Sequence, residues 1–211
     1  IDVYDPVYGA PLPPRSALSG SPTDSVSHTR ALVVQDQIHI TSRLSTLVGL
    51  RLDKYETSSL NNANGVTTTH KKDALTPTLG LSYAFNDAVT GYFTHGRSFK
   101  PNSGFDVNGK TFKPEQGKSL ELGLKTDLLN KRLQMTTALF NIVKDNVLTI
   151  DPVNPDYSIT AGQLRSRGLD MSLSGRLGSR TRITGYAALI DAEVTKDNTL
   201  QPGARLGDVP R

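Results

Sequence analysis

The feature that most constrains this chain is a strict alternation of apolar and polar side chains that recurs along most of its length. The alternation is cleanest over residues 164–195, which read as two strands joined by a two-residue turn. In the first of these strands Leu169, Met171 and Leu173 share one face, while Asp170 lies on the other. Successive side chains of a strand point to opposite sides, so the pattern predicts a sheet with one apolar and one polar face.

The same unit recurs before this hairpin, and the connections between strands alternate in length. The pattern predicts eight strands of roughly 10–14 residues, at about 29–40, 44–56, 73–85, 88–98, 116–127, 132–148, 164–177 and 180–195. Short turns are expected near Arg43, Asn86, Asn130 and Gly178. Long polar loops are expected at 57–72, 99–115 and 149–163, and the proline-rich residues 1–28 are interpreted as a further extracellular loop.

Strand length and connection length together indicate the class of fold. Soluble strands have a mode of about 5–6 residues, whereas a tilted strand needs roughly 9–11 residues to cross a bilayer. Short turns at one end and long loops at the other are typical of bacterial outer-membrane barrels. We therefore expect an all-β, antiparallel, up-and-down transmembrane β-barrel over residues 29–211, with the apolar face in lipid and the polar face in the lumen. A soluble β-sandwich also alternates, so a secreted β-sandwich adhesion module or a small non-transporting barrel remains the alternative.

Several other classes of protein are disfavoured by composition and motif. The formal net charge of +4 is spread along the chain, which argues against nucleic-acid binding. The chain has no cysteine, and its four histidines lack the spacing of a metal site, so no metal or cofactor is expected. Gly117-Lys118-Ser119 lacks the preceding glycine of a phosphate-binding loop, and no Gly-x-Ser-x-Gly elbow occurs, so an enzyme is not expected.

Three motifs indicate a family. In the first motif, Pro114 and Glu115 precede a strand that contains Glu121, Gly123, Leu124 and Lys125. The second motif is a Gly-x-Arg-x-Asp strand with Gly49, Arg51 and Asp53. The third motif is a Gly-Leu-Asp strand with Gly168 and Asp170. In order and spacing these motifs resemble TonB-dependent outer-membrane receptors of the ferric siderophore class, which includes ferrichrome-type receptors. The resemblance covers about residues 29–196, and it departs from the family in having aspartate rather than glutamate at Asp170.

The resemblance implies a function as well as a fold. Barrels of this family have about 22 strands around a plugged lumen, so eight strands would form part of the wall, and the plug is expected outside these residues. Such a receptor would bind a ferric siderophore at the cell surface of a Gram-negative bacterium. It would import the siderophore with energy from the TonB-ExbB-ExbD complex, which would act through the plug.

The resemblance also suggests which aromatic residues contact the ligand. Tyr8, Phe99, Phe105 and Tyr157 are expected in the long loops, and Tyr55 at the loop end of a strand. Phe105 and Tyr157 are the leading candidates. The competing interpretation places these side chains in the interfacial aromatic girdle or in loop packing. The face assignment adds one expectation. Arginine in place of Leu122 would meet lipid and impair membrane assembly, whereas arginine in place of Gly123 would impair it less if the lumen has room.

Overall fold

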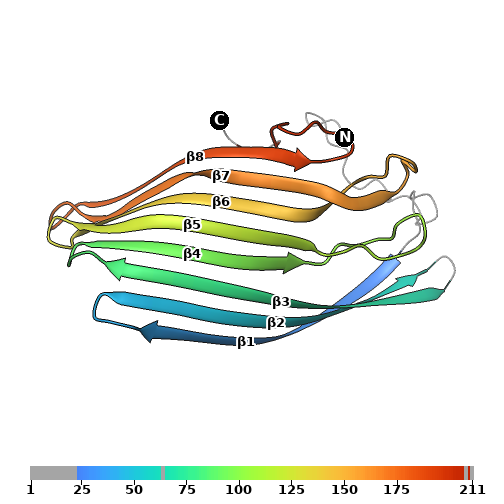
Figure 1. The fold of residues 1–211 in the computed structure, drawn as a ribbon, viewed down its shortest axis with the longest axis horizontal. Coiled ribbons are helices and arrows are strands. Elements are labelled where there is room, and N and C mark those ends of the chain that lie inside the picture. Colours follow the sequence, from blue (N-terminus) through green and yellow to red (C-terminus); the bar gives the residue numbers. More distant parts are fainter. Residues whose placement is uncertain (1–22, 63–64, 207–208, 210–211) are drawn as a thin grey trace, which may run out of the picture. The chain divides into compact units, whose positions relative to one another are not determined.

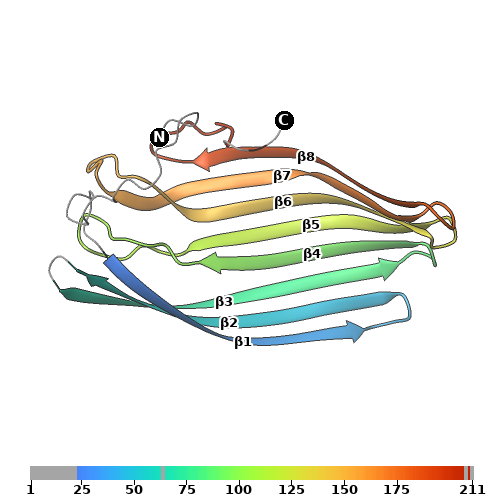
Figure 2. The same cartoon turned by 180° about the vertical axis from the view of Figure 1, so that it is seen from behind.

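The structure, a computed structural model, describes residues 23–62, 65–206 and 209, and its elements are all β-strands (Figure 1). The strands are β1 (Thr23–His39), β2 (Leu44–Asn61), β3 (Val66–Ala84), β4 (Val89–Lys100), β5 (Glu115–Leu128), β6 (Leu133–Ile150), β7 (Ser158–Arg176) and β8 (Arg182–Lys196). They form one sheet in which each strand neighbours the next along the chain, as the view from behind also shows (Figure 2). The registers from β3 to β8 are all antiparallel, which confirms the predicted all-β, up-and-down topology.

The chain divides into two compact units. The first comprises residues 1–29 and 55–71, and the second comprises residues 30–54 and 72–211. In the first unit hydroxyl side chains link neighbouring strands: Ser27 bonds Thr57 at 2.7 Å, and Ser58 bonds Thr69 at 3.0 Å. Among the described residues of this unit, polar cross-strand pairs therefore link neighbouring strands.

The second unit has one continuous apolar face. Following the registers from β3 to β8, one row of neighbours runs through Leu81, Phe93, Leu122, Leu139, Leu169 and Leu189. The adjacent row on the opposite face runs through Ser82, Tyr92, Gly123, Ala138, Asp170 and Ala188. The structure therefore confirms, for β3 to β7, which residues were predicted to share the apolar face, and it adds Leu189 of β8 to that face.

The apolar face has no protein cover among the described residues. Leu122, Leu139 and Leu189 are 60%, 58% and 72% exposed, and only five apolar side chains of the described part are buried. Exposed apolar surface this extensive is unfavourable in water, because burial stabilises by roughly 25 cal/mol per Å². Lipid is the environment that removes this cost without a second protein layer.

Strand boundaries differ from those expected. β1 begins at Thr23 and not at Thr29, so the boundary at residue 28 was wrong. Most of the expected loop 57–72 is strand, because β2 continues to Asn61 and β3 begins at Val66. The loop expected at 149–163 shortens to 151–157, whereas that at 99–115 lies close to its expected place, at 101–114. The outer ends of β2 and β3 are rich in serine and threonine. They show no alternation of apolar and polar residues, so the sequence pattern does not predict these parts of the strands.

The short turns lie where they were expected, at the end of the sheet opposite these loops. Asn86 closes one of them, since its side-chain oxygen accepts hydrogen bonds from the backbone N–H groups of Ala88 and Val89 at 2.8 and 2.9 Å. Leu129, Asn130 and Lys131 close the next with three successive positive φ angles of 51°, 55° and 65°. In the part of the chain that the structure describes, no helix is long and apolar enough to span a membrane.

Candidate functional site

The loop between β4 and β5 is folded on itself. Phe105 and Thr111 pair as an isolated β-bridge. The Asp106 carboxylate accepts hydrogen bonds from the backbone N–H groups of Asn108 and Lys110 at 2.9 and 2.8 Å. Phe112 is buried beneath this small hairpin, while Phe105 is 41% exposed. The loop thus presents an aromatic side chain on an ordered support.

Two asparagine side chains fasten this loop to β6. The Asn102 amide donates hydrogen bonds to the carbonyl oxygens of Lys113, at 2.7 Å, and of Asn146, at 2.9 Å. The Asn146 amide in turn donates to the Pro114 carbonyl oxygen at 2.9 Å. Asn146 sits at a register shift of β6 with a φ of 59°, a conformation that asparagine adopts more readily than most residues. We call these four residues, Asn102, Lys113, Pro114 and Asn146, the amide clasp.

Ion pairs hold the base of the same loop. The Glu115 carboxylate lies 3.5 Å from the Lys144 ammonium of β6 and 3.9 Å from the Lys100 ammonium of β4. Pro114 and Glu115, which the sequence identified only as a family motif, therefore sit where the loop is joined to its neighbours. Their geometry indicates a role in positioning the loop.

The loop between β6 and β7 carries the second leading candidate, Tyr157. Its turn is organised by Asp151, which is buried and accepts hydrogen bonds from the N–H groups of Val153 at 2.9 Å and Asn154 at 3.3 Å. These bonds stabilise the carboxylate and lower the pKa of Asp151. The backbone N–H of Asp151 also donates to the Tyr157 carbonyl at 3.0 Å, and the Tyr157 side chain is 45% exposed.

The remaining aromatic candidates are placed differently. Phe99 lies within β4 and not in the loop; it pairs with Gln116 and shares the face of Phe93, so it points away from the lumen face. Tyr55 lies inside β2 and shares a 3.2 Å hydrogen bond with Ser27. Tyr8 lies outside the described residues. Of the five candidates, only Phe105 and Tyr157 are exposed aromatic residues on described loops.

The motif residues of β2, and those of β5 other than Leu124, lie on the polar face. Arg51 binds Asp53 through two guanidinium nitrogens, at 2.7 and 2.8 Å, and Asp53 is only 5% exposed. The Tyr92 hydroxyl donates to Glu121 at 2.6 Å, and the Lys125 ammonium lies 5.3 Å from the centre of the Tyr92 ring. These interactions line the lumen face with paired charges.

Gly123 has a role that the sequence did not reveal. The Tyr92 ring covers it so closely that an added Cβ atom would overlap the ring. The condition on which arginine was expected to impair assembly less at Gly123, namely room in the lumen, is therefore not met, because the Tyr92 ring fills the space above Gly123. Phe140 covers Gly168 of β7 in a similar way, and Asp170 accepts a 3.2 Å hydrogen bond from the Tyr186 hydroxyl of β8.

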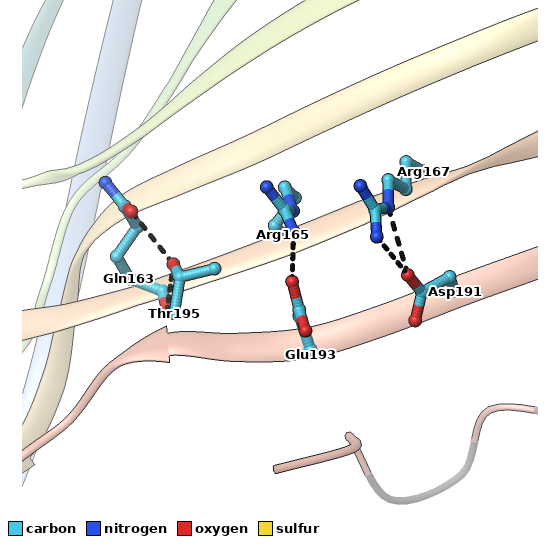
Figure 3. Close-up of polar contacts among 6 residues, drawn as sticks. All are labelled: Gln163, Arg165, Arg167, Asp191, Glu193 and Thr195. Carbon is cyan, nitrogen blue, oxygen red and sulfur yellow. Dashed lines mark hydrogen bonds and ion pairs between the residues drawn. The ribbon is translucent and has the colours of Figure 1, made fainter. Parts of the chain in front are cut away.

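A ladder of polar pairs joins β7 to β8 on the same face as Leu169 and Leu189, toward the loop end (Figure 3). Arg167 binds Asp191 at 2.9 and 3.0 Å, and Arg165 binds Glu193. The Thr195 hydroxyl donates to the Gln163 side chain at 2.8 Å. On β7 and β8, the run of apolar side chains on this face therefore ends between the pair Leu169–Leu189 and the pair Arg167–Asp191.

The side chains at the loop end provide a surface suited to binding. Residues 23–62, 65–206 and 209 contain no group of three or more histidine, aspartate or glutamate side chains placed to hold a metal ion. The exposed features at the loop end are aromatic and polar groups on ordered supports. Such surfaces supply contact area from aromatic rings and orientation from a few polar groups.

Comparison with known proteins identifies relatives along the whole chain. Residues 1–211 match the family described as TonB dependent receptor-like, β-barrel. The metal-pseudopaline receptor CntO of Pseudomonas aeruginosa is 42% identical over 219 aligned residues, which cover 100% of this chain and 30% of that protein. The ferrichrome outer membrane transporter/phage receptor of Escherichia coli is 33% identical, over 84% of this chain and 24% of that protein. The chain thus spans about a third or less of the length of these relatives.

Solved structures agree on the fold. The siderophore receptor PiuA from Acinetobacter baumannii superimposes with a TM-score of 0.73 at 24% identity, over 86% of this chain and 28% of that one. The alcaligin outer membrane receptor FauA from Bordetella pertussis gives the same TM-score and identity, over 87% of this chain and 33% of that one. These matches do not support a β-sandwich adhesion module or a small non-transporting barrel. The relatives are named as receptors and transporters and not as enzymes, and the chain belongs to the TonB-dependent receptor-like β-barrel family, whose members are outer-membrane proteins of Gram-negative bacteria.

Proposed function

We propose that this chain forms part of the barrel wall of a receptor that binds a chelated metal at the cell surface and imports it across the outer membrane. The observation that carries the proposal is the family match over all 211 residues, to which the ordered aromatic loops at one end of the sheet add a binding surface. Phe105 and Tyr157 supply the aromatic contacts in this proposal. The wall itself supplies the lumen face.

The proposed cargo is a ferric siderophore. Relatives named as ferrichrome and ferrioxamine B receptors support iron, whereas the relative at 42% identity is named for a metal–pseudopaline complex. A chelate of another metal is therefore the second candidate, and it shares the same chemistry of recognition, in which the protein contacts the chelator and not the metal. The proposed energy source is the TonB-ExbB-ExbD complex, acting through a plug domain encoded outside these residues.

The test is uptake by cells that express the full-length receptor and lack their own chelate receptors. Radiolabelled ferric siderophores and radiolabelled chelates of divalent metals are supplied in parallel. We expect accumulation of at least one chelate in cells with functional TonB, and none in otherwise identical cells without TonB. Equal uptake of every chelate in the two strains would contradict TonB-driven import, and surface binding without TonB-dependent accumulation would show a receptor that does not transport.

A further inference from the structure

The short-turn end of the sheet carries a row of three arginines that the proposed import function does not use. Arg176 and Arg182 are direct cross-strand partners at the ends of β7 and β8. Arg132 directly precedes Leu133, which pairs with Gly175, and its carbonyl accepts a 2.8 Å hydrogen bond from the backbone N–H of Arg176. The three residues therefore form one row across the ends of β6, β7 and β8, and we call it the arginine row.

The arginine row has no counter-charge within the part of the chain that the structure describes. Its three side chains are exposed, and none of them forms an ion pair with a described carboxylate. The Nε of Arg132 donates a 3.1 Å hydrogen bond to the Leu129 carbonyl, which is a neutral acceptor. Like charges placed directly opposite in adjacent strands destabilise a sheet. The row therefore favours an external anion that offsets this repulsion.

The two turns beside the row extend its positive charge. Residues 127–133 and 174–182 contain five cations, which are the arginine row with Lys131 and Arg180, and a single carboxylate, Asp127. The same two segments contain no aromatic residue, whereas the centre of a protein–protein interface is typically built on aromatic anchors. The surface therefore suits an extended polyanion that is contacted at several weak points, and not a compact protein partner.

The position of the row selects the source of the anions. Arg176 continues the alternation of Asp170, Ser172 and Ser174, so it belongs to the lumen face, which is turned away from lipid. It lies three residues, about 10 Å along the strand, beyond Leu173 of the apolar face on the short-turn side. With the short turns on the periplasmic side, a guanidinium at this place reaches into the periplasm. The polyanion that lies beneath the outer membrane of a Gram-negative cell is peptidoglycan, whose stem peptides carry carboxylates.

We propose that the arginine row binds the stem-peptide carboxylates of peptidoglycan and thereby docks the barrel on the cell wall. Each guanidinium binds a carboxylate with two parallel N–H···O hydrogen bonds. Neighbouring strands are about 4.8 Å apart, so the row presents its donors along about 10 Å of the barrel rim. Each arginine is expected to contribute about two- to fivefold in affinity, as exposed charge pairs do. The loss of all three is then about ten- to hundredfold if their contributions are independent.

The experiment measures sedimentation of the purified full-length receptor, in detergent, with purified peptidoglycan sacculi from which attached proteins have been removed. The row variant carries Arg132→Gln, Arg176→Gln and Arg182→Gln. The matched control removes three exposed cations at the loop end, so its net charge changes equally. Its substitutions are Arg97→Gln, Lys110→Gln and Lys196→Gln. Thermal unfolding of each protein reports folding, and the row variant should be at least as stable as the parent because it loses directly opposed like charges.

We expect the row variant to bind sacculi about ten- to hundredfold more weakly than the parent, and the control to bind like the parent. Sacculi whose carboxyl groups have been converted to amides should bind the parent as weakly as untreated sacculi bind the row variant. A melting temperature of the row variant below that of the parent would contradict the absence of a counter-charge in the row.

Three results would overturn the proposal. Parental binding by the row variant would exclude the row as the site. An equal loss of binding in the control would show attraction by net charge alone, and parental binding to amidated sacculi would exclude carboxylates as the ligands. The assay contains neither a chelate nor TonB, so its outcome is independent of the import function proposed above.

Discussion

Replacing Asn146 with alanine and with glycine separates two contributions of this residue to the amide clasp. Both changes remove the side-chain hydrogen bond to the Pro114 carbonyl, which is 2.9 Å long. Only alanine must also be forced into the positive φ of 59°, because glycine adopts that conformation without a steric cost. The two variants therefore differ by the conformational cost alone.

The magnitudes follow from these contacts. A lost hydrogen bond costs about 0.5–1.5 kcal/mol, and a non-glycine residue in the left-handed region costs about 1–2 kcal/mol. Asn146→Gly should therefore destabilise the closed loop by about 0.5–1.5 kcal/mol, and Asn146→Ala by about 1.5–3.5 kcal/mol. Asn102→Ala removes two hydrogen bonds and should cost about 1–3 kcal/mol.

Amide hydrogen exchange in the full-length receptor measures local opening of this loop. The N–H groups of Asp106 and Gly109 donate hydrogen bonds at 2.9 Å inside it and report its closure. We expect their exchange to accelerate about tenfold for each 1.4 kcal/mol of loop stability that is lost. The acceleration should be smaller in Asn146→Gly and larger in Asn146→Ala. The amides of Leu122 and Leu139, in the paired region of β5 and β6, serve as the internal control. Faster exchange in Asn146→Gly than in Asn146→Ala would refute the reasoning. Unchanged exchange in Asn146→Gly, Asn146→Ala and Asn102→Ala would refute it as well.

Three further predictions follow from the faces and the loops. Leu122→Arg places a cation in lipid and should impair membrane assembly by about 2–4 kcal/mol, whereas Ser172→Arg on the exposed lumen face should assemble normally; equal folded yields would contradict the faces. Because the pKa of Asp151 is lowered in the folded turn, the ionised carboxylate stabilises the turn at any pH above the ordinary aspartate pKa, and this stabilisation is lost as the pH falls through the lowered pKa. A spin label attached at Val153→Cys should therefore gain mobility only in strong acid. In the Asp151→Asn variant the same label should be mobile at every pH. Phe105→Ala and Tyr157→Ala should each weaken chelate binding about ten- to hundredfold, and parental affinity in both, measured with every chelate that the receptor takes up, would exclude these residues as ligand contacts.

The parts of this fold that the sequence predicted are those set by the period of two. In β5 and β7 leucine and methionine alternate with polar residues, so the lipid-facing and lumen-facing sets followed directly. The extent of β2 and β3 did not follow, because their outer ends are rich in serine and threonine. There the strands are stabilised by cross-strand hydroxyl pairs such as Ser27 with Thr57, which leave no hydrophobic signal.

The candidate site was predictable in part for the same reason. Proline and glycine located the loop that carries Phe105, and its exposure agrees with a binding role. Phe99 was misplaced because Pro101 suggested an earlier end to β4 than the structure shows. The amide clasp and the Tyr92 ring over Gly123 depend on contacts between residues far apart in the chain, and spacing in the sequence carries no information on such contacts.

The central claim is that this sheet is part of a barrel wall in the outer membrane. Residues 101–114 and 151–157 then lie outside the cell, and the short turns lie on the periplasmic side. The chain has no cysteine, so single cysteines report position without background. Cysteine at Asn108 or Val153, both exposed in the loops, should react with an impermeant thiol reagent on intact cells that express the full-length receptor. Cysteine at Asp87 or Ser179, in the short turns, should react only after the outer membrane is permeabilised. Labelling of the turns and not of the loops on intact cells would contradict the account.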